Sequence, residues 1–217
     1  MSEIITEQPQ TKKLRLNVPD ISKPGAFAWH VCDQKGCTAK FKKTSSLKQH
    51  KAFVHDIDVS NVRYMWNMFQ NATSFNQPLD KWNVSNVTNM KWMFWGAESF
   101  NQPLNNWNVS KVREMNCMFQ NATSFNQPLN KWNVSNLYFM WGMFDGASSF
   151  NQPLNNWNVS NVTNMKFMFC AAESFNQPLN NWNVSNVEDM EGMFKEATSF
   201  NQPLNNWNVS NFLDLDT

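Results

Sequence analysis

The chain has 217 residues and a formal net charge of +1, and its 18 Phe, 11 Trp and 13 Met provide ample apolar surface for a packed interior. No segment approaches the roughly 18 consecutive apolar residues of a membrane span. The first ten residues, MSEIITEQPQ, do not resemble a secretory signal. We therefore expect an intracellular protein of the cytoplasm or nucleus, without membrane contact.

Charge is distributed unevenly along the chain. Residues 1–55 carry ten Lys or Arg against four Asp or Glu, whereas residues 56–217 carry eight against thirteen. A basic front segment either contacts nucleic acid or is simply solvated. Its first part, residues 1–26, is rich in Lys, Pro and Gln and is expected to be a flexible basic arm.

A metal-ligand motif occupies residues 27–56. Its spacing, C-x4-C-x12-H-x4-H, is formed by Cys32, Cys37, His50 and His55. Two thiolates and two imidazoles complete a tetrahedron around Zn²⁺, and four protein ligands make such a site structural rather than catalytic. We expect one zinc ion, which supplies folding energy that so short a segment cannot obtain from a core.

The same segment resembles the two-cysteine, two-histidine (C2H2-type) zinc finger, because Phe41 and Leu47 stand where that family places its small core. The resemblance implies a ββα module. It also implies base-reading roles for four residues: Lys43, Ser45, Ser46 and Gln49. One finger alone is rarely specific, so nucleic-acid recognition and use as a protein-binding or structural module both stay open.

From residue 57 to residue 217 the sequence repeats a block of 25 residues without insertion. Six complete blocks and a terminal stub begin at the same Val-Ser step: Val59, Val84, Val109, Val134, Val159, Val184 and Val209. A fixed period of this size is typical of stacked repeats, in which each unit contacts only its neighbours.

Within each block the pattern predicts a short strand followed by a short helix. Trp82 and Val84 alternate as inward-facing strand residues, and Ser85 is placed to cap a helix. Apolar residues then recur at the spacing of one helical face: Val87, Met90, Phe94 and Ala97. The segment S-F-N-Q-P-L returns the chain to the next block through a turn at Pro103.

The recurring phrases W-N-V-S-N-V, M-x-x-M-F and S-F-N-Q-P-L resemble the BspA-like leucine-rich repeats of mycoplasma and other bacterial surface proteins and of some large DNA viruses of protists. The resemblance runs from about Val59 to Asn211. It implies an α/β repeat fold: a right-handed leucine-rich-repeat-like solenoid with parallel strands and short helices. It implies little about activity, because the fold hosts binding of many kinds. A finger in front of such repeats suits a viral or host-interacting protein better than a bacterial adhesin.

Two further features concern single residue types. Six asparagines share one predicted strand position: Asn83, Asn108, Asn133, Asn158, Asn183 and Asn208. Strands about 4.8 Å apart leave no room for a glycan on each, so a ladder of side-chain hydrogen bonds is expected there. Cys117 and Cys170 occupy unrelated block positions and are expected to be free thiols.

The sequence lacks the residue sets that catalysis needs. It contains three histidines, two of them in the zinc motif, and no glycine-rich phosphate loop. We therefore expect no enzyme and no small-molecule substrate. Three functions stay open: a zinc-binding interaction scaffold whose repeats bind a protein partner or self-associate, a nucleic-acid-associated regulator that uses the finger, and a virion or surface structural component.

The positions that vary between blocks predict where a partner binds. On a helical wheel with the apolar face inward, block positions equivalent to Trp92 and Trp95 point outward. Aromatic residues occupy these and flanking positions: Trp66, Trp92, Trp95, Trp141 and Phe167. Exposed aromatic residues are common at interfaces, so we expect them to contact a partner or another copy. The alternative is that the rings fold down between adjacent helices or under the finger.

Overall fold

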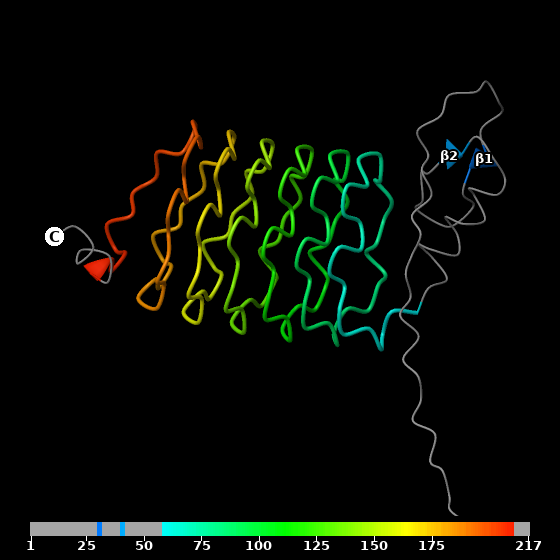
Figure 1. Ribbon diagram of the computed structural model, residues 1–217, viewed down its shortest axis with the longest axis horizontal. Helices are drawn as coiled ribbons and strands as arrows, with labels where there is room; N and C mark the ends of the chain where they lie inside the picture. Colours follow the sequence, from blue (N-terminus) through cyan, green and yellow to red (C-terminus); the bar gives the residue numbers. More distant parts are fainter. Residues whose placement is uncertain (1–29, 32–39, 42–57, 211–217) are drawn as a thin grey trace, which may run out of the picture.

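The computed structural model describes residues 30–31, 40–41 and 58–210. The first two of these parts are short strands, β1 (His30–Val31) and β2 (Lys40–Phe41). They pair in antiparallel register, with His30 opposite Phe41 and Val31 opposite Lys40. Residues 58–210 form a row of similar coils stacked one on the next (Figure 1).

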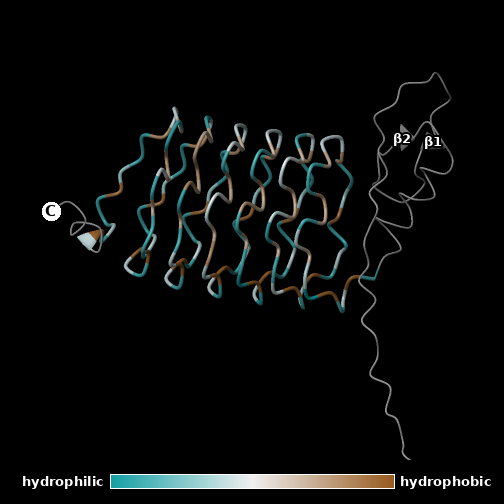
Figure 2. Cartoon of the chain, viewed as in Figure 1, coloured by the Kyte–Doolittle hydropathy of each residue, from teal (hydrophilic) through white to brown (hydrophobic). Residues whose placement is uncertain are grey.

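Phenylalanine rings fill the interior of the stack in two columns. One column contains Phe69, Phe94, Phe119, Phe144, Phe169 and Phe194, and the other contains Phe75, Phe100, Phe125, Phe150, Phe175 and Phe200. Phe94 lies 5.6 Å from Phe119 in its own column and 4.0 Å from Phe100 in the other, measured between ring centroids. Because equivalent residues stack on one another, hydrophobic and hydrophilic segments alternate similarly in successive coils (Figure 2).

A third column consists of tryptophans, and from the second repeat onward each ring is fixed by a hydrogen bond as well as by packing, whereas the indole N–H of Trp82 in the first repeat has no partner in the part of the chain that the structure describes. The Nε1–H of Trp107 donates to the carbonyl oxygen of Leu79 in the preceding repeat, at 3.0 Å. The same bond recurs for Trp132, Trp157, Trp182 and Trp207. In these five repeats the buried indole therefore has its polar group satisfied and links two neighbouring coils.

Backbone hydrogen bonds join each coil to the next. The amide of Met90 donates to the carbonyl of Glu114 at 3.0 Å, and the amide of Phe94 donates to Met118 at 2.9 Å. One parallel bridge per repeat forms an unbroken row: Tyr64, Asn89, Glu114, Phe139, Asn164 and Asp189. The predicted stacking of 25-residue units is thus present.

The predicted α/β solenoid with parallel strands and short helices is wrong, first because residues 58–210 contain no α-helix. The helical-face residues are buried as predicted, yet the backbone between them turns the wrong way for a helix. Trp92 has φ of 58° and Gly96 has φ of 67°. A left-handed residue cannot continue a right-handed helix, so the segment becomes a series of tight turns, such as Met93 N–H to Met90 O at 3.2 Å.

The predicted strands are also wrong. At Trp82 the chain turns, because its amide donates to the carbonyl of Leu79 at 3.0 Å. Across residues 58–210 parallel pairing is confined to single bridges. These lie five residues after Val84, at Asn89, where a helix was expected.

The asparagine ladder predicted for Asn83 and its equivalents is wrong. The side chain of Asn83 accepts a hydrogen bond from the amide of Ser85 in its own repeat, at 3.2 Å, which is a local Asx turn. A ladder between repeats is formed instead by the asparagines of the S-F-N-Q-P-L segment. The Oδ1 of Asn101 accepts from the amide of Asn126 and from Nε2 of Gln127, each at 3.0 Å.

Candidate functional site

Three neighbouring rows of side chains that differ between repeats lie on one side of the stack. Met65 points inward and is 1% exposed, whereas Tyr64 and Trp66 on either side of it are 64% and 56% exposed. We define the variable face as the three rows at the positions of Arg63, Tyr64 and Trp66. The other residues in these rows are Thr88, Asn89, Lys91, Arg113, Glu114, Asn116, Tyr138, Phe139, Trp141, Thr163, Asn164, Lys166, Glu188, Asp189 and Glu191, of which Asn116 is buried.

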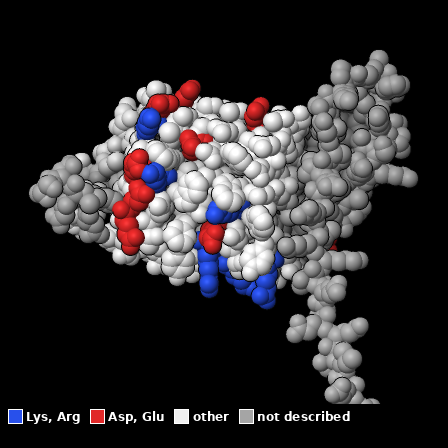
Figure 3. Space-filling model, viewed as in Figure 1, with Lys and Arg blue, Asp and Glu red and all other residues white. Residues whose placement is uncertain are grey.

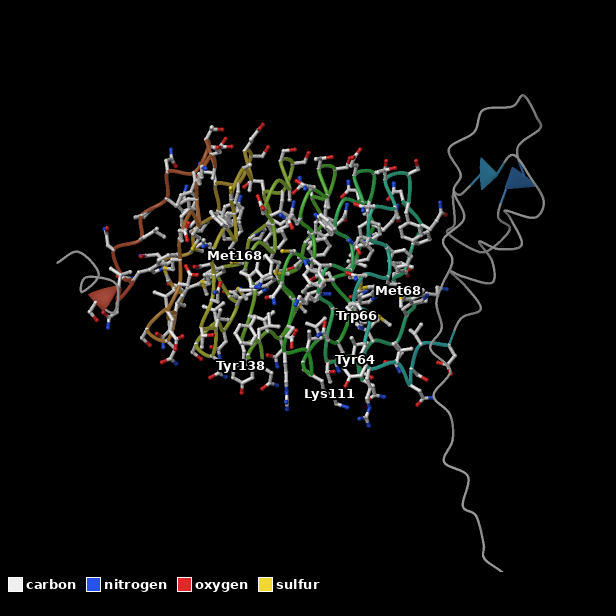
Figure 4. All side chains as sticks on the ribbon, viewed as in Figure 1. Tyr64, Trp66, Met68, Lys111, Tyr138 and Met168 are labelled. Carbon is white, nitrogen blue, oxygen red and sulfur yellow. The ribbon has the colours of Figure 1, made fainter. Side chains whose placement is uncertain are left out.

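A groove of about 440 Å³ opens on the variable face over the first three repeats. Its lining consists of Tyr64, Trp66, Asn89, Lys91, Trp92 and Glu114. Of these, Tyr64 lies toward the same edge of the stack as Lys111, with Trp66 next to it (Figure 4). Exposed rings and charged groups therefore meet in one place.

Hydrogen bonds hold the polar side chains of this groove in place. Asn89 donates from Nδ2 to Oε2 of Glu114 at 2.9 Å, and its Oδ1 accepts from the amide of Lys91 at 3.0 Å. The ammonium of Lys91 lies 4.1 Å from the ring centroid of Trp92, which is cation–π geometry. The groove thus offers an ammonium, a carboxylate and aromatic faces in a preformed arrangement.

The predicted partner residues differ in how far they reach solvent. Trp66 is exposed, whereas Trp92, Trp95, Trp141 and Phe167 are half-buried. The structure brings Trp66 and Trp92 together in the groove, and Trp141 lies on the variable face; Trp95 lines neither. The half-buried rings are thus neither fully exposed to a partner nor fully folded down into the stack, which were the two alternatives set out from the sequence.

Sequence reasoning missed four lining residues of the groove: Tyr64, Asn89, Lys91 and Glu114. A signal for them exists in the repeats. The positions on either side of the constant Met65 and Met90 change from block to block, while the methionines do not. Variation beside a fixed buried residue marks an outward-facing row.

One position in each repeat, next to this face, has a left-handed backbone. Side chains at this position in neighbouring repeats share the same space, so a large one requires a small neighbour. The position is occupied in turn by Asn67, Trp92, Cys117, Gly142, Phe167 and Gly192, all with positive φ. A Cβ on Gly192 would lie 2.3 Å from Cε1 of Phe167, so glycine makes room for that ring. Cys117 similarly lies under Gly142, with Sγ 3.0 Å from the place of a Cβ.

Two thiols and one carboxyl group are perturbed by burial in this region. Burial raises the pKa of the Cys117 thiol to about 12 and also raises the pKa of Cys170. Both cysteines are free, as predicted. Burial likewise raises the pKa of Asp145, although a hydrogen bond from Gln120 at 2.6 Å opposes the shift. Protonated thiols are poor nucleophiles, so neither cysteine has the character of a reactive centre.

Residues predicted for the finger lie outside the part of the chain that the structure describes. These are the zinc ligands Cys32, Cys37, His50 and His55 and the base-reading residues Lys43, Ser45, Ser46 and Gln49. Among the described residues, no group of three or more His, Cys, Asp or Glu is placed to hold a metal ion. Within those same ranges, no helix is long and apolar enough to cross a membrane.

The stack defines a repeat protein whose 25-residue units share one interior and differ on one face. The family described as "Mycoplasma protein of unknown function, DUF285" matches residues 35–145 and 127–217, so the chain belongs to this family. The match confirms the resemblance of the repeats to the BspA-like family. No curated protein and no solved structure matches the chain.

Proposed function

We propose that this chain is a non-enzymatic interaction scaffold whose variable face binds a protein partner or a second copy of the chain. One observation carries the proposal. Five large hydrophobic side chains are exposed in residues 58–210, and four of them lie on the variable face: Tyr64, Trp66, Tyr138 and Phe139. Exposed apolar patches of this kind mark interaction sites on monomeric proteins, and Tyr and Trp are the residues that most often anchor interfaces.

The interior of the stack supports this role. Every repeat is tied to the next by backbone ladders, by Trp–carbonyl bonds and by asparagine bonds. Side chains on the variable face are therefore held at regular intervals on a framework that does not depend on them. Such pre-organisation lowers the entropic cost of binding.

The test compares partner capture by the full chain with capture by a double variant, Tyr64→Ser with Trp66→Ser. An extract of the cells in which the protein is naturally made is passed over each immobilised protein, and bound proteins are identified by mass spectrometry. We expect a partner to be lost from the double variant and retained by Val209→Ser, which removes the one exposed large hydrophobic side chain of residues 58–210 that lies off this face. Equal capture by all three chains would exclude the variable face as the binding surface.

We further propose that residues 27–56 bind one structural Zn²⁺ through Cys32, Cys37, His50 and His55. The pairing of β1 with β2 supports this site, because β1 ends immediately before Cys32 and β2 begins shortly after Cys37. An antiparallel hairpin is the element on which a finger carries its two thiolates. When bound, zinc would supply folding energy to this segment and no catalysis.

Elemental analysis of the full chain, purified without chelator, tests the zinc site. We expect about one equivalent of zinc per chain, and little in Cys37→Ala. Cys117→Ala is the matched control, because Cys117 is a buried free thiol within the repeats. Less than about half an equivalent in the unmodified chain, or equal zinc in Cys37→Ala, contradicts the proposal.

A further inference from the structure

The groove on the first three repeats has a counterpart on the last three. Three repeats after each lining residue stands a residue of the same chemical type: Phe139, Trp141, Asn164, Lys166, Phe167 and Asp189. The residues that stand one or two repeats after the lining residues do not reproduce this combination of chemical types. The variable face is therefore two similar halves placed one after the other, repeats one to three and repeats four to six.

The hydrogen bonds of the groove recur together with its residues. Asn89 donates to the carboxylate of Glu114 at 2.9 Å, and Asn164 donates to the carboxylate of Asp189 at 3.4 Å. The Oδ1 atoms of both asparagines also accept a backbone amide two residues later, at 3.0 Å in each case. The same scaffold of polar contacts thus supports both halves.

The cation–π contacts recur as well. The ammonium of Lys91 lies 4.1 Å from the ring centroid of Trp92, and that of Lys166 lies 5.1 Å from the centroid of Phe167. Lys166 differs in also pairing with Glu191 of the next repeat. The two halves therefore share their aromatic and polar residues, and they differ in the net charge of the residues around them.

The two halves of the variable face carry opposite net charges. In the first half, three basic residues accompany one acidic residue, a net charge of +2: Arg63, Lys91, Arg113 and Glu114. In the second half, one basic residue accompanies three acidic residues, a net charge of −2: Lys166, Glu188, Asp189 and Glu191. Basic side chains gather beside the first repeats and acidic ones toward the last repeats (Figure 3).

We propose that a second copy of this chain docks face to face on the variable face in antiparallel orientation, so that the first half of each copy contacts the second half of the other. This inference rests on the proposed function and names its partner. Parallel docking would oppose like charges, whereas antiparallel docking opposes +2 with −2 at both ends. The two-fold axis passes between the third and fourth repeats, so the contact is isologous and closes as a dimer.

This arrangement gives the exposed groups partners of suitable chemistry. Arg63 in the first repeat faces the sixth repeat of the other copy, where Glu188 is exposed. Arg113 in the third repeat faces the fourth repeat, where Tyr138 and Phe139 are 47% and 43% exposed. A guanidinium over such rings is a favourable cation–π contact.

The length of the face sets the expected strength of association. Five ladder spacings of about 4.8 Å make it roughly 24 Å long, which is short for an interface of standard size. We therefore expect dissociation constants on the order of micromolar rather than nanomolar, with clear dependence on salt.

The experiment is sedimentation equilibrium of the full chain from about 1 to about 200 μM, with two charge-reversal variants. Arg63→Glu with Arg113→Glu makes the whole face acidic, and Glu188→Arg with Glu191→Arg makes it basic. We expect each variant alone to associate at least about tenfold more weakly than the unmodified chain. An equimolar mixture should form a heterodimer, because each half then meets the opposite charge in both places. Lys131→Glu changes an exposed lysine off the face and should have no effect.

Each other outcome overturns the inference. A chain that stays monomeric over this range, or dimers that survive both reversals, would show that the face does not pair with itself. The unmodified chain provides a second measurement that needs no variant: raising NaCl from about 50 to about 500 mM must weaken association. A monomeric chain that still requires Tyr64 and Trp66 to capture another protein would refute the dimer and leave the proposed scaffold standing.

Discussion

Aromatic side chains dominate both the buried columns and the variable face, and the comparison shows what separates structure from recognition in this chain. Trp107 is 3% exposed and Trp66 is 56% exposed. Trp107 stacks 6.4 Å from Phe94, and its indole N–H reaches a carbonyl of the preceding repeat. Trp66 has no such carbonyl partner among the described residues and instead lines the groove. Residue type alone does not distinguish the two roles; position in the repeat does.

The difference also explains which positions are free to vary. A residue in a column contacts its own equivalents in both neighbouring repeats, so a change in one repeat disturbs two others. A residue on the variable face stands beside its equivalents without being enclosed by them. The repeats can therefore carry Tyr, Asn, Glu, Phe, Asn and Asp in one row without loss of the stack.

The largest expected effect is the loss of a buried column ring. Trp107→Ala removes ring packing and the bond to the Leu79 carbonyl, so we expect the free energy of unfolding to fall by about 3 to 5 kcal/mol. Urea denaturation measures this. Trp207→Ala is the matched control, because the same position in the last repeat is only half-buried, and its cost should be clearly smaller. Equal costs would show that the columns do not stack as described.

A smaller effect is expected from the asparagine ladder. The Oδ1 of Asn126 accepts from the amide of Asn151 at 3.0 Å and from Nε2 of Gln152 at 2.9 Å. Asn126→Ala leaves both donors unpaired in a half-buried place and should cost about 1 to 3 kcal/mol in urea unfolding. Asn133→Ala, which removes one exposed local bond to Ser135, should cost less than about 1 kcal/mol. The reverse order would restore the ladder first predicted for Asn133 and its equivalents.

The left-handed positions give a pair of changes with opposite signs. Gly146 has φ of 67°, and a Cβ there would lie 2.2 Å from Oδ1 of Asn121. Gly146→Ala should therefore destabilise the stack by about 1 to 2 kcal/mol. Ala171 occupies the equivalent position with φ of 50°, and Ala171→Gly should be neutral or stabilise by up to about 1 kcal/mol. Thermal unfolding of the two variants decides whether this position is strained.

The period and the buried residues of the stack could be predicted from the sequence, because columns of identical residues require identical spacing. Val87, Met90, Phe94 and Ala97 are buried as expected. Their spacing suggested a helix, since turns closed every three residues bury apolar side chains at a similar interval. The contrary signal was present at Gly96, Gly142, Gly146 and Gly192, which recur at two positions where a helix interior disfavours glycine.

The candidate site was predicted less completely than the core. Trp66 and Trp92 were identified because large aromatic residues stand out against the constant text of the blocks. Tyr64 was not, because its row was assigned to the predicted helix away from the outward positions, and Lys91 was not, because only the aromatic residues of its row, Trp66 and Trp141, were singled out. Which row faces outward depends on where the backbone bridges to the next repeat. That bridge at Asn89 follows from contacts between repeats, and the sequence signals it only through the variation beside the constant methionines, which appears when the repeats are compared.

The smallest expected effect on stability belongs to the variable face, and it decides whether the comparison holds. Tyr64 and Trp66 are more than half exposed, so Tyr64→Ser with Trp66→Ser should change the free energy of unfolding by no more than about 0.5 to 1 kcal/mol. The same two rings should nevertheless be required for association, because exposed rings gain most of their burial only in a complex. Urea unfolding and sedimentation of this double variant, set beside Trp107→Ala, measure both quantities. A loss of several kcal/mol would mean that the rings belong to the core. Full stability with unchanged association would remove the face from recognition. Full stability with lost association is the outcome that separates an aromatic residue that builds the stack from one that the stack presents.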